Sequence, residues 1–167
     1  GNGIDPIEVV DLFGADALRF TLISSAGVGN DIYLDHKNLE ASFSTGRNFA
    51  NKLWNAGRFV LMSLGDQPVP SMEMVKDNLE LEDRWILSRL QKVVTNVTYN
   101  LESFRLHEVS EDIYHFVWGD FADWYLELIK IRMQSEAGGD SQQAARGTLV
   151  SVMDGICRLL HPLMPFV

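Results

Sequence analysis

Apolar residues recur at helical spacing along four long stretches of the chain. In residues 35–64 they follow one another at alternating steps of four and three, and the stretches at 82–101, 106–133 and 141–160 show similar spacing. Such steps place side chains on one face of an α-helix. We therefore predict four long amphipathic helices. The apolar face of the first comprises Leu39, Phe43, Gly46, Ala50, Leu53, Gly57, Val60 and Leu64.

Two short helices are predicted ahead of these four. Asp5 is followed by Pro6 and Glu8, which is the order of a capping acid, a proline at the first helical position and a glutamate three residues after the cap. Gly14 ends this helix because glycine interrupts the pattern there. Residues 16–25 form the second short helix.

Glycine and proline mark the connections between the predicted helices. A loop is expected at 26–31, and residues 65–70 end the first long helix. A linker containing Met72 and Met74 follows, and residues 138–140 break the chain before the last helix. The sequence contains no paired strands with hairpin turns, no repeat and no low-complexity tract. The pattern therefore predicts an all-α fold, an antiparallel bundle of four long helices preceded by two short helices.

The stretch at 106–133 has apolar residues around most of its circumference, which is typical of a helix at the centre of a bundle. These residues are Val109, Ile113, Phe116, Val117, Phe121, Trp124, Leu128 and Ile131. Trp124 is thus expected to be buried. Its replacement by alanine is expected to cost several kcal/mol of stability, as large aromatic truncations in cores do.

The composition is that of a globular domain, since 46% of the 167 residues are apolar and 22% are charged. Cys157 is the only cysteine, which excludes an internal disulfide and a zinc cluster and fits a reducing, cytosolic compartment. No apolar run is long enough to span a bilayer, and no signal peptide is visible. Gly1 is not a natural first residue and Val167 follows a dense apolar run, so we expect a piece of a longer protein.

The net charge of −9 argues by itself against a nucleic-acid partner, because phosphate contacts need lysine and arginine. The order of the charges along the chain changes this interpretation. Basic residues prevail at 36–65 and 84–105, whereas acidic residues prevail in 1–35, 66–83 and 106–129. Only the two basic segments are expected to face a polyanion.

Signals for catalysis are weak. The four histidines are scattered, and none lies at metal-ligand spacing from a second histidine or a cysteine; they are His36, His107, His115 and His161. The segment 27–29 is too short for a dinucleotide-binding fingerprint and follows no predicted strand. Asp120 and Asp123 could act as a general acid–base pair. The favoured interpretation is that each carboxylate pairs with an arginine of a neighbouring helix.

A polar stripe follows the first long helix. At about 100° per residue it comprises Arg47, Asn51, Asn55 and Arg58, with Asn48 and Lys52 beside it. We expect it to border the apolar face. Asparagine and arginine read base edges or phosphates, and unpaired RNA bases stack on aromatic rings such as those of Trp54 and Phe59. The alternative is a solvated helix face with hydrogen bonds inside the bundle.

Several longer strings resemble class I aminoacyl-tRNA synthetases. The first two resemble the segment after the KMSKS signature loop, the third resembles the first long helix of the anticodon-binding domain, and the valyl branch fits best. The strings are Gly1-Asn2-Gly3-Ile4-Asp5-Pro6, Phe13-Gly14-Ala15-Asp16-Ala17-Leu18-Arg19-Phe20, Arg47-Asn48-Phe49-Ala50-Asn51-Lys52-Leu53-Trp54-Asn55-Ala56, Asp83-Arg84-Trp85-Ile86-Leu87-Ser88-Arg89-Leu90, Phe121-Ala122-Asp123-Trp124-Tyr125-Leu126-Glu127 and His161-Pro162-Leu163-Met164-Pro165-Phe166.

The resemblance implies a role within a larger enzyme. The parent would activate valine with ATP and load it onto tRNA, with a catalytic domain that precedes Gly1. Residues 1–35 would be the connector after the signature loop, and residues 36–167 the anticodon-binding bundle. We expect this piece to hold no cofactor, metal or catalytic residue and to be inactive alone. We expect a cytoplasmic monomer that binds a valine-accepting tRNA, and neither DNA nor a membrane.

The residues predicted to contact tRNA are Arg47, Asn51, Lys52, Asn55 and Arg58. Of these, Arg47 and Asn51 are the best candidates for a structural role instead. Three alternatives stay open. The chain could be a protein-interaction bundle, which the acidic charge would suit, or an enzyme that uses Asp120, Asp123 and a histidine. It could also come from an isoleucyl or leucyl relative.

Overall fold

The computed structural model describes residues 3–27, 29–134 and 139–167, and every regular element in these ranges is a helix. The prediction of an all-α fold is thus confirmed. Within the described part, no helix is both long and apolar enough to cross a membrane. Three sequence features fall partly outside it: residues 1–2 of the first string, residue 28 of the glycine loop and residue 138 of the break before the last helix.

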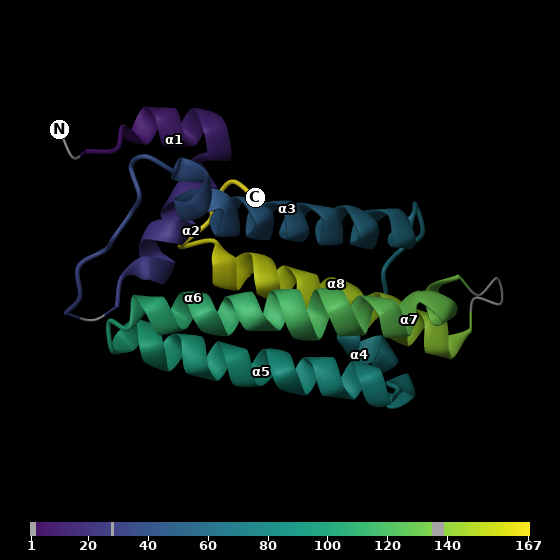
Figure 1. Ribbon diagram of the computed structural model, residues 1–167. Coiled ribbons are helices and arrows are strands. Elements are labelled where there is room, and N and C mark those ends of the chain that lie inside the picture. Colours follow the sequence, from purple (N-terminus) through teal and green to yellow (C-terminus); the bar gives the residue numbers. More distant parts are fainter. Residues whose placement is uncertain (1–2, 28, 135–138) are drawn as a thin grey trace.

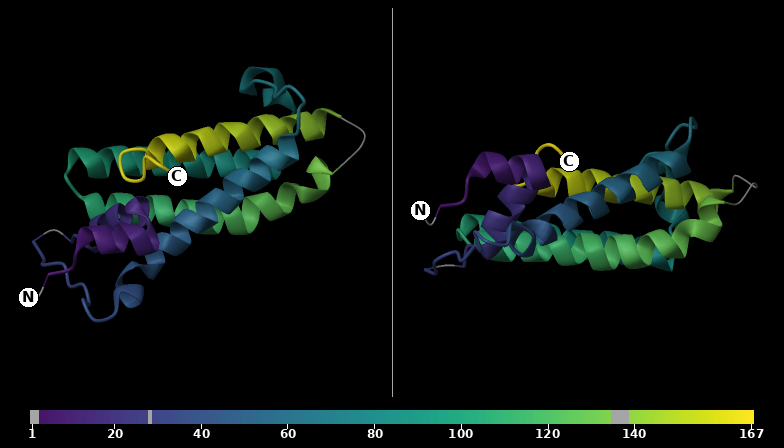
Figure 2. Two further views of the ribbon diagram at one scale, coloured as in Figure 1. Left: turned by 90° about the horizontal axis from the view of Figure 1, so that it is seen from above. Right: turned by 45° about the horizontal axis from the view of Figure 1, so that its top comes forward.

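Four long helical rods form the body of the molecule (Figure 1). They are α3 (Leu39–Leu64), α5 (Leu81–Glu102), the continuous rod of α6 (Leu106–His115), η2 (Phe116–Tyr125) and α7 (Leu126–Met133), and α8 (Asp140–Leu160). Successive rods run in opposite directions, as predicted. Seen from above, α3 crosses α8 and the α6–α7 rod obliquely (Figure 2). This crossing leaves one side of α3 open along most of its length.

The two short helices pack against one end of the bundle. α1 (Pro6–Phe13) begins where predicted, since the Asp5 carboxylate accepts a hydrogen bond from the Ile7 amide at 2.9 Å. α2 (Ala15–Ser25) contacts both α3 and α6. It approaches α3 so closely at Gly46 that a Cβ atom there would lie 2.5 Å from the carbonyl oxygen of Ala17. A glycine is therefore required at this crossing.

The segment predicted as a linker contains additional helix. Its elements are α4 (Met72–Val75) and the 3₁₀-helix η1 (Lys76–Asn78), both in contact with α8. Val75 is buried, and a Cβ atom on Gly147 of α8 would lie 3.0 Å from its Cγ2 atom. One turn of helix is too short to show a period in the sequence, so packing against α8 reveals it and the linker prediction is corrected.

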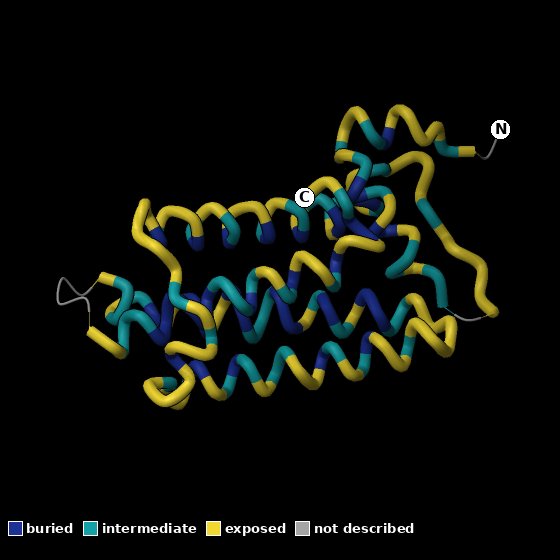
Figure 3. Tube along the Cα trace, turned by 180° about the vertical axis from the view of Figure 1, so that it is seen from behind, coloured by how far each residue is buried: buried dark blue, intermediate teal, exposed yellow. Residues whose placement is uncertain are grey.

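The α6–α7 rod is central, as predicted, but Trp124 is not part of the core. Its side chain is 64% exposed, whereas Tyr125 beside it is fully buried. The buried line along this rod advances four residues at a time through Ile113, Val117, Phe121, Tyr125 and Ile129. Figure 3 colours the backbone by burial, and the longest run of consecutive buried residues, 144–149, lies in the neighbouring helix α8.

The physical reason for the error at Trp124 is the helix type. η2 is a π-helix, whose hydrogen bonds join residues five apart, so each turn takes more residues than an α-turn. The α-helical period predicts Trp124 in the core, and the wider turns rotate it out and bring Tyr125 in. Leu128 and Ile131, which the α-helical pattern also places in the apolar face, are likewise exposed.

Candidate nucleic-acid interface

The outward side of α3 carries the stripe that the sequence singles out. The helix is capped by Asn38, whose side chain accepts a hydrogen bond from the Ala41 amide at 3.1 Å. Its buried side comprises Phe43, Gly46, Phe49, Leu53, Ala56, Val60 and Leu64. Because Phe49 and Ala56 join the core, this side is rotated away from the predicted apolar face. The stripe, expected to border the core, faces solvent at Asn51, Asn55 and Arg58.

Arg47 is engaged at the end of the stripe nearest the short helices. Its guanidinium binds both carboxylate oxygens of Glu40, at 2.6 and 2.9 Å. The hydrogen bonds to Glu40 raise the pKa of Arg47. The guanidinium also lies 5.4 Å from the ring centre of Phe13 on α1. Arg47 therefore links the start of α3 to α1.

Lys52 is engaged toward η2. Its ammonium nitrogen lies 2.7 Å from a carboxylate oxygen of Asp123 and 5.2 Å from the ring centre of Trp118. Both partners of the ion pair are partly exposed, so the pair contributes little to stability. Lys52 is consequently positioned at the edge of the α3 surface and neutralised there.

The side chains of the remaining three residues of the predicted set have no polar partner in the described ranges. Asn51, Asn55 and Arg58 make no side-chain hydrogen bond or ion pair with any residue in the described ranges. Residues 41–64 contain no acidic residue, although the chain as a whole carries a net charge of −9. The outward side of α3 therefore carries no acid from residue 41 to the end of the helix.

Apolar side chains lie exposed among these polar residues. Trp54 is 66% exposed, and Leu61 and Met62 are 72% exposed. A hollow of about 190 Å³ lies between α3 and α8, which we call the α3–α8 groove. Its walls are Leu53, Trp54, Gly57, Arg58, Leu61, Met153, Cys157 and Val167. The helical pattern of the sequence marks Trp54 but not the α8 side of the groove, because nothing in the pattern shows which α8 residues face α3.

A second hollow lies on the other flank of α3. This α3–η2 groove has a volume of about 170 Å³ and is lined by Lys52, Asn55, Ala56, Phe59, Ala122 and Leu126. The structure therefore divides the predicted residues. Arg58 belongs to the α3–α8 groove, Lys52 and Asn55 belong to the α3–η2 groove, and Asn51 lies on the exposed side of the same helix.

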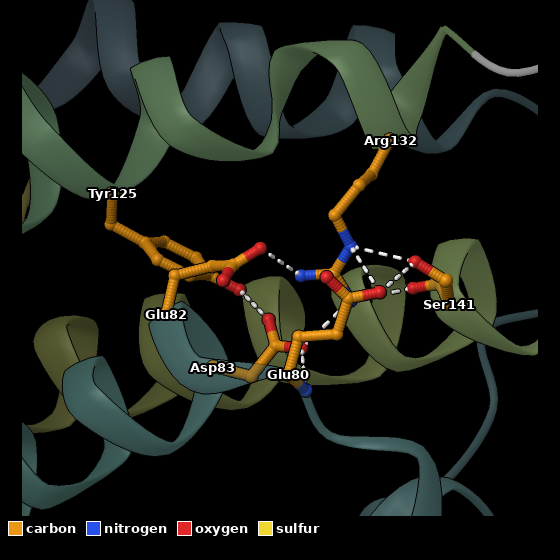
Figure 4. A network of polar contacts seen from close by, with 6 residues as sticks. All are labelled: Glu80, Glu82, Asp83, Tyr125, Arg132 and Ser141. Carbon is orange, nitrogen blue, oxygen red and sulfur yellow. Dashed lines mark hydrogen bonds and ion pairs between the residues drawn. The ribbon is translucent and has the colours of Figure 1, made fainter.

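A buried polar network joins α5, η2, α7 and α8 at one end of the bundle (Figure 4). The guanidinium of Arg132 lies 2.7 Å from the carboxylate of Asp83 and 2.8 Å from that of Glu82. It also donates hydrogen bonds to the side-chain and carbonyl oxygens of Ser141. The hydroxyl of Tyr125 donates to the other oxygen of Asp83 at 2.9 Å. Asp83 is fully buried and every charge here has a partner.

The network perturbs the titration of its members. Burial raises the pKa of Tyr125, and the negative charge of Asp83 raises it further, because both disfavour a phenolate. Burial lowers the pKa of Arg132, but the hydrogen bonds and charge of Asp83 outweigh it and raise that pKa overall. The hydroxyl thus stays protonated and the guanidinium charged, which keeps the network intact at neutral pH.

The acid pair in η2 has an ordinary structural role. Asp120 accepts a hydrogen bond from Arg89 of α5 at 2.7 Å, and Asp123 binds Lys52 of α3. The expected partner is confirmed for Asp120, whereas for Asp123 the base is lysine instead of arginine. The two carboxylates belong to ion pairs with different helices and do not share one site. In the described ranges no histidine, cysteine or carboxylate cluster is arranged to hold a metal ion.

Known proteins resemble this chain over its whole length. The valine–tRNA ligase of Nostoc sp. is 43% identical to it over an alignment that covers 99% of this chain and 18% of that protein. Those of Synechocystis sp. and Thermotoga maritima are both 46% identical, covering 99% and 100% of this chain and 19% and 18% of theirs. The chain thus spans about a fifth of the length of these relatives.

A protein family matches the second half of the chain. The family described as the anticodon-binding domain of tRNA ligase matches residues 83–167, which include most of α5, the α6–α7 rod, α8 and the network residues Asp83, Tyr125, Arg132 and Ser141. The match covers just over half of the chain and agrees with the full-length similarity to valine–tRNA ligases. This chain belongs to the family of anticodon-binding domains of tRNA ligases.

Proposed function

We propose that this chain is the tRNA-binding bundle of a valine–tRNA ligase and that it receives the anticodon loop on the outward side of α3. One observation carries the proposal. In an acidic protein, the solvent face of α3 is free of acids from residue 41 to the end of the helix, and its Asn51, Asn55 and Arg58 have no partner in the described ranges while Trp54 is exposed. Free amides, a free guanidinium and an exposed ring are the groups with which proteins bind unpaired RNA.

The five predicted residues divide into three roles in this proposal. Asn51, Asn55 and Arg58 contact the RNA directly, since nothing in the described ranges competes for their polar atoms. Lys52 lies at the edge of the contact and exchanges Asp123 for a phosphate when RNA binds. Arg47 positions the start of α3 through Glu40 and Phe13. Acidic surfaces elsewhere favour approach of the tRNA from this side alone.

The larger enzyme would ligate valine to its tRNA, as the name of the relatives, valine–tRNA ligase, states, and would use ATP to do so. In it, residues 1–35 would be the connector from the signature loop and residues 36–167 the anticodon-binding bundle. The contacts of α2 with both α3 and α6 support this role for the connector, because they tie it to the helix that carries the proposed RNA surface. We propose a monomer in the cytosol, where a single unpaired cysteine stays reduced.

The test is a binding titration of the protein against transcripts of a valine tRNA, an isoleucine tRNA and a leucine tRNA, at low and moderate salt. We expect the valine tRNA to bind most tightly and its affinity to fall as salt rises, because phosphate contacts release counterions. Tighter binding of the isoleucine or leucine tRNA would reassign the chain to that branch. Absence of tRNA binding would favour a bundle that binds protein.

A further inference from the structure

Large hydrophobic side chains lie exposed at the turn between α5 and α6, which we call the α5–α6 tip (residues 99–106). Phe104 is 84% exposed, and Tyr99, Leu101 and Leu106 are exposed beside it in the sequence. Exposed hydrophobic side chains that gather in one place mark sites of interaction with another surface. The tip is therefore a candidate docking surface at one end of the bundle.

The backbone at Phe104 makes its ring hard to explain by packing within the bundle. The amide of Phe104 donates to the carbonyl of Leu101 at 3.1 Å. The next amide, of Arg105, donates to the carbonyl of Asn100 at 2.8 Å, and the two bonds form the Schellman motif that ends a helix. Phe104 takes the left-handed position of this motif, with φ 57°, where glycine or asparagine is usual because a Cβ atom is strained there. The residue thus costs stability locally and its exposed ring gains little in return.

The tip is fixed in place beside the connector helix α2. The side-chain amide of Asn100 donates to the carboxylate of Asp112 at 3.1 Å, which joins the end of α5 to α6. The ring of His107, three residues after Phe104, contacts the carbonyl oxygen of Ser24 near the end of α2. All views in Figures 1 and 2 place the α5–α6 turn at the end of the bundle where α1 and α2 lie. The exposed ring is therefore presented at the end that holds the connector.

The charges at the tip favour a protein surface over RNA as its partner. Residues 99–112 contain four acidic residues and one arginine, and acids repel phosphate. Protein interfaces are apolar at their centre and polar at their rim, with charges that complement each other. The surface that fits this tip is thus an apolar patch with lysine or arginine at its rim.

We propose that the α5–α6 tip docks on the part of the enzyme that precedes the connector, with the ring of Phe104 seated in an apolar patch of that part. The inference rests on the proposed function, because it takes residues 1–35 as the link to the catalytic part. The chain spans about a fifth of the length of the valine–tRNA ligases it matches, so an enzyme of this kind has ample further chain to supply the patch. The tip is a second contact besides the connector and fixes the orientation of the bundle.

Hydrogen–deuterium exchange of the full-length enzyme and of this chain tests the docking. We expect the amides of residues 103–108 to exchange at least about tenfold more slowly in the full-length enzyme without tRNA, because docking covers the turn. Phe104→Asn in the full-length enzyme should return their exchange to the rate measured in this chain. Ile131→Asn is the matched control, since Ile131 is 83% exposed but lies on α7, and it should leave the protection unchanged.

The melting temperature of this chain distinguishes docking from a structural role of the ring. Asparagine adopts the left-handed backbone more readily than phenylalanine, so Phe104→Asn should raise the melting temperature of this chain by about 2 °C. The same substitution should remove the protection of the tip in the full-length enzyme. A fall of several degrees in this chain would show that the ring packs within the bundle, and would overturn the inference.

The remaining outcomes separate the docking from the proposed function. Protection of the tip without tRNA supports docking even where the titration finds no tRNA binding, a result that would overturn only the proposed RNA surface. Protection that appears only after valine tRNA is added would assign the tip to RNA and overturn the inference. Equal exchange in the full-length enzyme and in this chain would also overturn it, and would leave the proposed tRNA binding standing.

Discussion

The outward side of α3 and the network around Arg132 contain similar groups in opposite states. In the network, an arginine, a tyrosine and several acids from two helical rods are partnered, and the central carboxylate of Asp83 is fully buried. On α3, an arginine, a tryptophan and two asparagines lie in solvent without partners in the described ranges. The polar groups of the network are all paired with one another, whereas those on α3 have no partner within the described part of the protein.

The difference shows which region contributes to the stability of the fold and which is available for binding. A buried polar group costs several kcal/mol unless it is paired, so the network has to be satisfied by the fold itself and cannot also bind a ligand. Exposed groups on a helix contribute little to stability. Those on α3 are therefore available for a partner, and substitutions in the two regions should separate stability from RNA affinity.

The largest effect is expected for Arg132→Ala. It leaves Asp83 and Glu82 without their cation at a buried site, so the free energy of unfolding should fall by about 3–5 kcal/mol in urea titrations. Arg158→Ala is the control, because it removes only an exposed pair with Asp154 and should leave the free energy of unfolding nearly unchanged. Equal losses for the two variants would show that the network is not what holds this end of the bundle.

Tyr125→Phe should have the next largest effect on stability. It removes a hydrogen bond to a charged acceptor, which is worth about 1.5–3 kcal/mol. The variant should also change the pH dependence. Because the folded protein holds the phenol proton more tightly than the unfolded chain, this contribution is complete below the ordinary pKa of about 10 and is lost as pH rises above it.

Denaturation between neutral and strongly alkaline pH measures this contribution. The unmodified protein should lose stability above about pH 10 with a slope that exceeds that of Tyr125→Phe by up to 1.4 kcal/mol per pH unit, about the value for one proton. Parallel curves for the two proteins would contradict the role given to the buried hydroxyl. Tyr33 is exposed, so Tyr33→Phe should leave the slope unchanged.

Arg58→Ala, on α3, should lower the affinity for RNA and leave the stability of the protein nearly unchanged. We expect affinity for valine tRNA to fall about tenfold and the salt slope to decrease by about 1, because one phosphate contact is lost, with little change in the melting temperature. Arg84→Ala is a matched control, since Arg84 is also exposed and unpaired in the described ranges but lies on α5. A large loss of stability with RNA affinity retained would make Arg58 a structural residue.

The smallest effect is expected for Trp124→Ala. The α-helical pattern predicts a loss of several kcal/mol, whereas the exposed position in the structure predicts a change within about 0.5 kcal/mol. Urea titration decides between them. A loss above about 2 kcal/mol would mean that η2 is wound as an ordinary α-helix in solution, with Trp124 inside and Tyr125 outside.

Much of the fold follows from local sequence. The cap at Asp5, the stop at Gly14 and the four long amphipathic segments all appear in the structure near the predicted residues. These features are predictable because caps and helical periodicity depend on residues at most a few positions apart. α4 and the rotation of η2 were missed because both depend on what the segment packs against.

The candidate site was predictable in part. The stripe of asparagine and arginine on α3 is a local pattern and was found. The partners of its basic residues are not predictable from this pattern. Arg47 binds Glu40 and lies over the ring of Phe13, and Lys52 pairs with Asp123, which is 71 positions away in the chain. The α8 wall of the groove, with Met153 and Cys157, has no signal in the sequence of α3.

The sequence by itself determined the helix content, the absence of acids in residues 41–64 of α3 and the resemblance to tRNA ligases, since each depends on residue identity and short-range spacing. Tertiary structure alone decided which polar groups form hydrogen bonds or ion pairs within the protein and which remain unpaired. A charge is neutralised only where another helix brings its partner within reach, and an apolar hollow exists only where two helices cross without filling the space between them.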